Sequence, residues 1–210
     1  GEDLAEGVVR GVVVLAPASS VHTHRWAVAL AARGLQITLL TQHPPERDSY
    51  PPEIRVELLP HRGNRGYLMN ARAVRKLLRY LKPDLLHAHY ASGYGLLGLL
   101  AGYHPYLLSV WGSDVFEFPY QSRFKAWLLR RNLLAADGLA STSRVMAKQV
   151  KHLAPSLQAP IWITPFGVDV QRFAGMPATG TGAITIGTVK SLAPTYGIDT
   201  LIRSFALLRS

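Results

Sequence analysis

Short apolar runs alternate with longer segments along this chain of 210 residues. Eight runs rich in Val, Ile and Leu are candidate strands, at residues 12–16, 37–41, 54–59, 84–89, 106–111, 138–143, 161–165 and 183–189. Runs that are apolar on both faces are typical of a parallel sheet covered by helices on its two sides. The pattern therefore predicts an α/β fold with a doubly wound parallel sheet.

Several segments between these runs have the signals of helices. Residues 22–33 follow two capping residues, Ser19 and Ser20, and stop before a glycine that suits a helix end. Residues 67–81 repeat leucine and valine at helical spacing, with arginine and lysine on the opposite face. Residues 121–136 and 198–208 are the other helix-like segments that matter below.

A change of composition after Pro165 indicates a domain boundary. The segment 166–182 ends in a linker rich in Pro, Gly and Thr, and a new apolar run starts behind it. One strand and one helix do not bury the two faces of a sheet. We therefore expect a first domain over 1–169, a linker over 170–182, and the first strand and helix of an incomplete second domain over 183–210.

The composition excludes several classes of protein. Hydrophobic residues make up 48% and charged residues 17%, which is too apolar for a disordered chain. There is no cysteine, so disulfides, thiolate metal sites and cysteine nucleophiles are excluded. No apolar run reaches the roughly 18 residues that cross a bilayer, and the acidic start is unlike a secretory signal. A cytoplasmic location is the expectation.

The charge is positive and unevenly placed. The chain has 23 Lys and Arg against 13 Asp and Glu, and residues 62–82 contain seven basic residues and no acidic one. Residues 121–152 repeat this, with seven basic residues against Asp137. Such a field attracts phosphates of nucleotides, nucleic acids or anionic lipids. The basic residues either solvate two surface helices or mark a membrane-facing surface.

The loop between the first strand and the first helix is the first candidate site. It offers hydrogen-bonding side chains next to a helix N-terminus, where unpaired N–H groups suit an anion. The residues are Ser19, Ser20, His22, His24 and Arg25. No glycine-rich dinucleotide fingerprint follows a strand, which argues for a polar substrate. The alternative is an ordinary helix cap with its polar residues on the surface.

Two further strand ends carry polar side chains. Strand alternation places His87 and His89 on the same face, and a wall of a polar cleft is preferred there over a metal site, because a third ligand at matching spacing is absent. In the stretch SVWGSD, Gly112 frees Asp114 to accept hydrogen bonds or to act as a base. Alternatively, Ser113 and Asp114 cap the next turn.

Six segments in this order resemble glycosyltransferase family 4. They are SSVHTHRW, HAHYASGYGLLG, SVWGSDVFEFP, AADGLASTS, ITPFGVDVQRF and IGTVKSLAPTYGIDTLIRSFALL, and together they extend over almost the whole chain. The resemblance implies the GT-B fold, in which two Rossmann-like domains face a cleft. The first domain holds the acceptor and the second holds a nucleotide-sugar, usually a UDP- or GDP-sugar. It also implies transfer with retention of configuration and no metal or other cofactor.

The resemblance assigns roles to residues by position. Asp114 and His89 are the catalytic candidates, and Trp111 stands where many relatives have a histidine. The candidates for acceptor binding are Ser19, Ser20, His22, His24, Arg25, Tyr90, Trp111, Gly112 and Ser113. The candidates for donor binding are Gly167, Asp169 and Lys190. The paired glutamates of the family's donor domain are not in this sequence.

The prediction is therefore the acceptor-binding half of a retaining glycosyltransferase, inactive as this chain alone. Its partners would be a nucleotide-sugar, a glycan or lipid-linked acceptor and an anionic membrane surface reached through the basic helices, with the chain peripheral on the inner face. Two alternatives stay open. One is a non-catalytic partner subunit, and the other is a basic nucleic-acid-binding module, although no recognition motif for nucleic acid is present.

Overall fold

The structure is a computed structural model that describes residues 9–46, 50–168, 170–171, 175 and 186–208. The chain divides into two compact units, Gly1–Gly167 and Val168–Ser210. Each unit is described by itself below.

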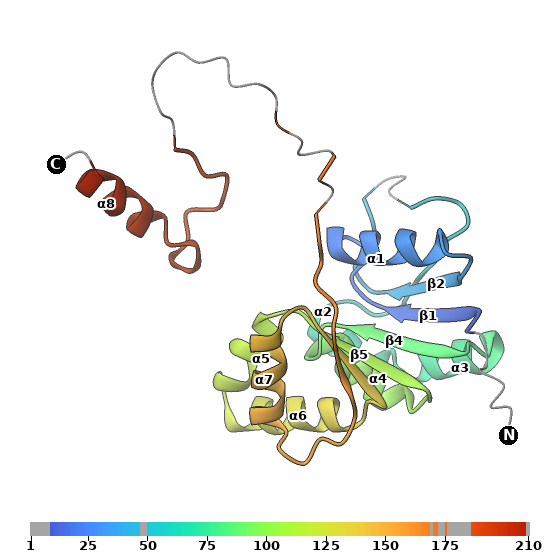
Figure 1. Cartoon of the computed structure of the whole chain (residues 1–210). Coiled ribbons are helices and arrows are strands. Elements are labelled where there is room, and N and C mark those ends of the chain that lie inside the picture. The colour runs from blue at the N-terminus through green and yellow to red at the C-terminus, as the bar shows by residue number, and fades with distance from the viewer. Residues whose placement is uncertain (1–8, 47–49, 169, 172–174, 176–185, 209–210) are drawn as a thin grey trace, which may run out of the picture. The chain divides into compact units, whose positions relative to one another are not determined.

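The described part of the first unit is built on a sheet of seven parallel strands (Figure 1). The strands are β1 (Gly11–Leu15), β2 (Gln36–Thr41), β3 (Arg55–Leu58), β4 (Leu85–His89), β5 (Tyr106–Val110), β6 (Gly138–Ser141) and β7 (Ile161–Ile163). Their order is β3-β2-β1-β4-β5-β6-β7, and every pair is parallel. This confirms the predicted α/β, Rossmann-like sheet.

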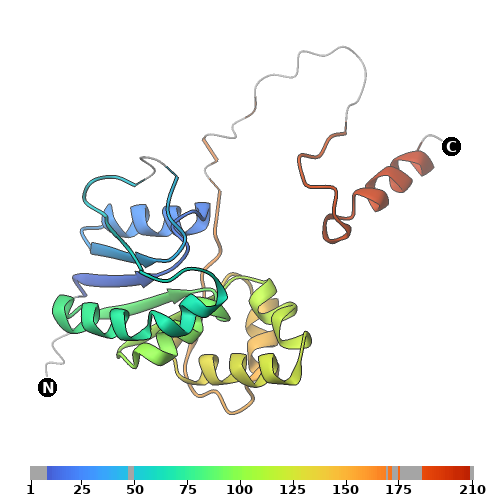
Figure 2. The ribbon, with the colours of Figure 1, turned by 180° about the vertical axis from the view of Figure 1, so that it is seen from behind.

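Helices cover both faces of the sheet. They are α1 (Val21–Ala31), α2 (Gly63–Met69), α3 (Ala71–Leu81), α4 (Gly93–Ala101), the short α5 (Ser113–Phe116), α6 (Arg123–Leu134) and α7 (Arg144–Leu153), with a 3₁₀ turn η1 (Phe118–Tyr120). On β1, Val12 and Val14 join the core under α1, whereas Val13 and Leu15 join the core of the opposite face. In Figure 2, α3 lies on the side of the sheet opposite α1. Among the described residues, no helix combines the length and the apolar character needed to span a bilayer.

The segment 67–81, which was predicted as one helix, is two helices. α2 ends at Met69 and α3 begins at Ala71, so the prediction was wrong at this point. The cause is Asn70 between them, whose buried amide accepts from the His61 backbone N–H at 3.0 Å and donates to the His61 carbonyl at 2.8 Å. Asparagine favours such side-chain to backbone bonds over continued helix.

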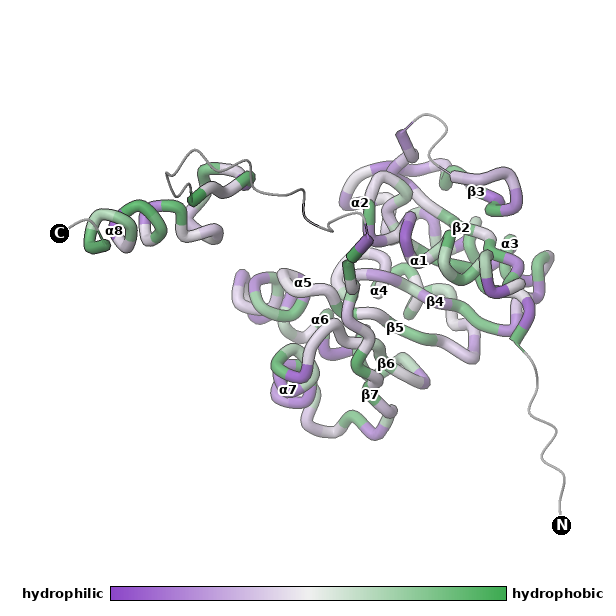
Figure 3. The backbone as a smooth tube through the Cα atoms, turned by 45° about the horizontal axis from the view of Figure 1, so that its top comes forward, coloured by the Kyte–Doolittle hydropathy of each residue, from purple (hydrophilic) through white to green (hydrophobic). Residues whose placement is uncertain are grey.

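The second unit contains a 3₁₀ turn η2 (Pro194–Tyr196) and the helix α8 (Ile198–Leu208). The predicted helix over 198–208 is thus confirmed. Hydrophobic and hydrophilic residues alternate along α8 (Figure 3). The predicted strand over 183–189 is not found where it can be judged, because residues 186–189 are irregular and 183–185 lie outside the described residues. A strand needs a neighbouring strand to complete its hydrogen bonds, and the described residues of this unit contain no strand to pair with it.

Glycine lets α4 lie close to the sheet. A Cβ placed on Gly98 would come within 2.4 Å of the Tyr106 hydroxyl, and Tyr106 on β5 is fully buried. We expect Gly98→Ala to lower the free energy of unfolding by about 2 kcal/mol, since overpacking outweighs the gain in helix propensity. Urea unfolding measures it. The control is Gly95→Ala on the same helix, where an added Cβ would lie 3.3 Å from Leu108 Cδ1, and this change should cost less stability. Gly102 is unsuitable as a control because its φ of 60° disfavours alanine.

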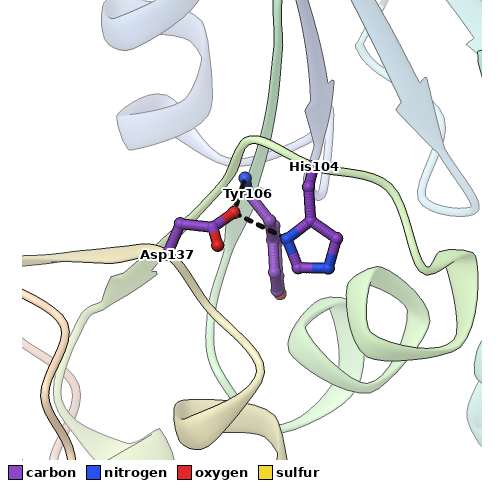
Figure 4. A network of polar contacts seen from close by, with 3 residues as sticks. All are labelled: His104, Tyr106 and Asp137. Carbon is purple, nitrogen blue, oxygen red and sulfur yellow. Dashed lines mark hydrogen bonds and ion pairs between the residues drawn. The ribbon is translucent and has the colours of Figure 1, made fainter.

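An ion pair ties β5 to β6 at the amino ends of these strands (Figure 4). The Asp137 carboxylate accepts from the Tyr106 backbone N–H at 2.7 Å and contacts His104 Nδ1 at 2.6 Å. Both side chains are more than half exposed, so this contact contributes little to stability. It lies at the edge of the sheet opposite the candidate site.

Candidate functional site

The candidate site lies where the sheet reverses its strand order. The chain proceeds from β1 to β2 on one side and later from β4 to β5 on the other, and β1 and β4 are neighbours. Loops at the carboxyl ends of these two strands leave in opposite directions, which opens a crevice in sheets of this type. The loops after β1, β4 and β5 therefore bring the predicted residues to one edge.

The loop after β1 is held by its own cap and by β2. The Ser20 side chain accepts from the His22 backbone N–H and caps α1, so the capping alternative is correct for this residue. The Ala18 backbone N–H donates to Thr41 Oγ1 at 3.1 Å. Ser19 stays exposed at the tip of the loop. These hydrogen bonds hold the loop at Ala18 and Ser20, and the exposed hydroxyl of Ser19 is available to a ligand.

Trp111 lies at the centre of an aromatic cluster that we call the Trp111 cluster. Its ring centroid is 5.6 Å from His22, 5.0 Å from His89, 6.5 Å from Tyr90 and 5.5 Å from Phe166. His22 also stacks on Phe166 at 3.8 Å. These rings come from four separate segments of the chain. The half-buried rings of Trp111, His22 and Phe166 give the crevice an aromatic wall, whereas His89 is fully buried.

His87 and His89 project from the same face of β4, as predicted, with ring centroids 4.3 Å apart. His87 Nε2 is 2.8 Å from Ser109 Oγ, whereas neither ring nitrogen of His89 has a hydrogen-bond partner among the described residues. Burial lowers the pKa of His87 to about 3. Burial, and secondly the charge of His87, lower the pKa of His89 far below its usual range. Both imidazoles are therefore neutral near pH 7.

The described residues include no group of three or more His, Asp and Glu placed to hold a metal ion. The two histidines on β4 therefore form a pair without a third ligand. A neutral imidazole with unpaired nitrogens is able to donate to a ligand hydroxyl with one nitrogen and to accept with the other.

Asp114 is fully buried and joins two of the loops. Its carboxylate accepts from the backbone N–H groups of Ala91 at 2.8 Å, Gly112 at 2.8 Å and Trp111 at 3.1 Å. Burial raises the pKa of Asp114, and these three N–H donors act against that rise. Because all its partners are donors, the group is held as a carboxylate. The geometry favours a positioning role for Asp114 over a direct role as a base.

The backbone around Asp114 takes conformations that few residues adopt. Gly112 has φ 144°, which strains any residue with a side chain, so the glycine predicted to free Asp114 is required for the turn itself. Tyr90 has φ 77°, and its hydroxyl forms a hydrogen bond with Ser113 Oγ. Non-glycine residues in this region are often found at functional sites.

A basic cavity of about 450 Å³ adjoins the Trp111 cluster. It is lined on α1 by His22, Arg25, Trp26 and Arg33, and on the segment after β7 by Phe166. Arg25 Nη1 donates to the Gly167 carbonyl at 3.3 Å, which connects two predicted site residues. Burial, followed by the charge of Arg25, lowers the pKa of His22. Two guanidinium groups and an aromatic wall suit a ligand that has both a phosphate and an apolar face.

The remaining predicted residues are His24, Lys190 and Asp169. His24 packs against Tyr50, with ring centroids 5.1 Å apart, and lines a separate cavity of about 300 Å³ together with Ser19. Lys190 belongs to the second unit, where its Nζ is 5.2 Å from the Tyr196 ring. Asp169 lies outside the described residues.

Two residues that shape the site were not predicted from the sequence. Trp26 lies 5.8 Å from His87 and 6.1 Å from His89, and its position four residues after His22 would have placed it on the same face of α1. Asn132 on α6 is fully buried, and its amide donates to the carbonyls of Ala91 at 2.8 Å and Ser92 at 3.1 Å. A lone asparagine in a helix gives no sequence signal of such a long-range contact.

The fold is an α/β domain with its candidate site at the switch point of the sheet. A family model described as glycosyl transferase 4-like matches residues 11–143, more than half of the chain. The chain belongs to this family, which confirms the resemblance seen in the sequence motifs.

The chain is also similar to individual known proteins, which are consistent with this family. The chain is 32% identical over 106 residues to TuaC of Bacillus subtilis (strain 168), a protein assigned to teichuronic acid biosynthesis as a glycosyltransferase; the match takes in 48% of this chain and 26% of that protein. Sucrose-phosphate synthase from Thermosynechococcus elongatus is similar in fold, with a TM-score of 0.60, 15% identity, and coverage of 77% of this chain and 49% of that chain.

A second solved structure is that of Anabaena Alr3699/HepE in complex with UDP and glucose. Its TM-score is 0.56 at 13% identity, with coverage of 78% of this chain and 46% of that chain. At such identities the likeness shows the fold alone. The chain thus spans about a quarter of the curated relative and about half of each of these two solved chains.

Proposed function

We propose that this chain is the acceptor-binding half of a retaining glycosyltransferase, which moves a sugar from a UDP- or GDP-sugar to a polysaccharide or lipid-linked acceptor. The observation that carries the proposal is the basic, aromatic-walled cavity beside the Trp111 cluster, at the switch point of a glycosyl transferase 4-like sheet. The relative's assignment to teichuronic acid biosynthesis and the UDP and glucose bound to a structural neighbour support it.

The acceptor sugar would lie against the aromatic rings of the Trp111 cluster. A sugar ring has an apolar face that packs on an aromatic ring, and its hydroxyls need partners at the edge. Ser113 and Tyr90 bring hydroxyls on the neighbouring loops, and the two unpaired nitrogens of His89 lie buried next to Trp111. In this proposal Asp114 holds the loops that carry Trp111 and Gly112. His89 is fully buried in this structure, so it contacts the substrate only when the rings around it move aside.

The phosphate-binding part of the proposal rests on cations. Arg25 lines the basic cavity and is tied to Gly167, so it is placed to meet a phosphate of the donor or of a lipid-linked acceptor. Gly167, Asp169 and Lys190 are proposed for donor binding by their positions in the family motifs. Guanidinium and ammonium groups stabilise a leaving diphosphate by charge, so the proposal needs no resident metal or cofactor.

The proposed place of action is the cytoplasm, at the inner face of a membrane, because a lipid-linked acceptor and a basic surface both favour that position. As this chain alone, the domain is proposed to bind acceptor without transferring sugar.

The test is a thermal-shift panel of UDP, GDP, ADP and their common sugars. It is run on this chain and on this chain fused to the carboxyl-terminal domain of a family member. We expect one nucleotide class to stabilise the fused form only, by about 1.4 kcal/mol at ten times Kd, or roughly 2 °C in a fused protein about twice the size of this chain.

The matched controls separate specific binding from the overall charge. Arg25→Gln in the fused form should reduce the shift, and Arg72→Gln on α3 should not. Stabilisation of the 210-residue chain alone by a nucleotide-sugar would contradict the assignment of this half to the acceptor.

A further inference from the structure

One face of α6 combines exposed aromatic rings with arginines. At 100° per residue, six exposed residues fall within an arc of roughly 120° on this helix. We call them the α6 face, and they are Arg123, Phe124, Trp127, Arg130, Arg131 and Leu134. The opposite side of α6 carries the buried residues Leu129, Asn132 and Leu133, so the α6 face points away from the core.

The aromatic residues of this face are unusually exposed for their size. Phe124 is 66% exposed and Trp127 is 53% exposed, and their rings stack at 5.8 Å. Leu134 continues the apolar stripe and is also exposed. An exposed stripe of large apolar side chains is typical of a surface that contacts a partner or a membrane.

The charge around the stripe has one sign. Residues 118–136 include four basic residues and no acidic one. The guanidinium of Arg131 lies over the Trp127 ring at 5.5 Å, and Arg123 and Arg130 flank the stripe on the same face. The partner of this face therefore has anionic groups next to an apolar layer. That combination is the chemistry of an anionic lipid bilayer at its headgroup level.

The other basic helix is less suited to a bilayer. Arg72, Arg75 and Arg79 of α3 line a cavity of about 530 Å³ together with Tyr103, and Arg75 Nε donates to the Leu100 carbonyl at 2.8 Å. These arginines surround a hollow instead of bordering a row of exposed rings. The two basic segments of the sequence thus differ, and the aromatic stripe belongs to α6.

We propose that the α6 face docks this domain on an anionic lipid surface, with Phe124 and Trp127 inserted among the headgroups and the arginines bound to lipid phosphates. Asn132, on the buried side of α6, bonds the carbonyls after β4, so the docked helix is attached to the loops of the candidate site. This inference deepens the peripheral position proposed above. Vesicle binding needs no nucleotide-sugar, so the two proposals can fail independently.

The test is co-sedimentation of the 210-residue chain with vesicles of equal parts phosphatidylcholine and phosphatidylglycerol, against pure phosphatidylcholine. At low salt, we expect binding to the mixed vesicles and no binding to pure phosphatidylcholine. High salt should abolish the binding to the mixed vesicles. Trp127→Ala should weaken binding about tenfold, whereas Trp162→Ala on β7, at the same 53% exposure, should leave it unchanged. Arg123→Gln with Arg130→Gln should weaken it about 30-fold, and Arg72→Gln with Arg79→Gln on α3 is the control of equal charge.

Fluorescence gives a second readout on the folded protein. Brominated phosphatidylcholine in the mixed vesicles should quench part of the tryptophan emission, and Trp127→Phe should remove that quenching. Equal binding by Trp127→Ala and the parent chain, or a larger loss from the α3 pair, would overturn the proposal. Binding of a single-stranded oligonucleotide that competes with vesicles and depends on Trp127 would assign the face to nucleic acid instead and also overturn it.

Discussion

Asp114→Asn is expected to lower the free energy of unfolding by about 3 kcal/mol, because it replaces a buried acceptor of three N–H groups with an amide that itself carries N–H. The lost acceptor leaves the N–H groups of Ala91, Trp111 and Gly112 competing for one oxygen. No solvent reaches the group to compensate, since Asp114 is fully buried. The loops after β4 and β5 should then separate.

Urea unfolding at neutral pH measures the effect. Glu117→Gln, three residues along the chain and exposed, is the matched loss of one carboxylate and should change stability by less than about 0.5 kcal/mol. If Asp114→Asn cost no more than Glu117→Gln, the carboxylate would not be the group that joins the two loops, and a direct role in chemistry would regain support.

The position of Asp114 was predicted from the sequence, but its role was not. The apolar run before it and Gly112 correctly placed it at the carboxyl end of a strand. Its partner Ala91 lies 23 residues earlier, and the pairing follows only from the adjacency of β4 and β5. Sequence alone left both a catalytic role and a cap open, because the burial that separates them is a property of the packed loops.

The fold was easier to predict than the site. Apolar runs identified the seven strands because a parallel sheet buries both faces. The prediction failed where a side chain overrode periodicity, as with Asn70 between α2 and α3. α4 has three glycines among its nine residues, which weakens any helix signal; the contact with Tyr106 that requires Gly98 becomes visible only in three dimensions.

The two buried histidines of β4 should make the domain sensitive to acid. In the unfolded chain each has a pKa near 6.5, whereas in the fold the pKa of His87 is about 3 and that of His89 is far below its usual range. Below pH 6.5 the unfolded state therefore binds up to two more protons than the folded state, so stability falls as the pH falls. Between pH 7.5 and 5.0 the two groups together should remove about 4 kcal/mol.

Denaturant unfolding at several values of pH tests this, and His89→Leu separates the two groups. The leucine removes one titrating ring from the contact with Trp26 and Trp111, so about half of the loss between pH 7.5 and 5.0 should disappear. His152→Gln, at an exposed position near the end of α7, should leave the full dependence in place. An unchanged dependence in His89→Leu would mean that His89 takes up a proton within the fold, and that the neutral pair assigned to the acceptor side of the site does not exist near pH 6.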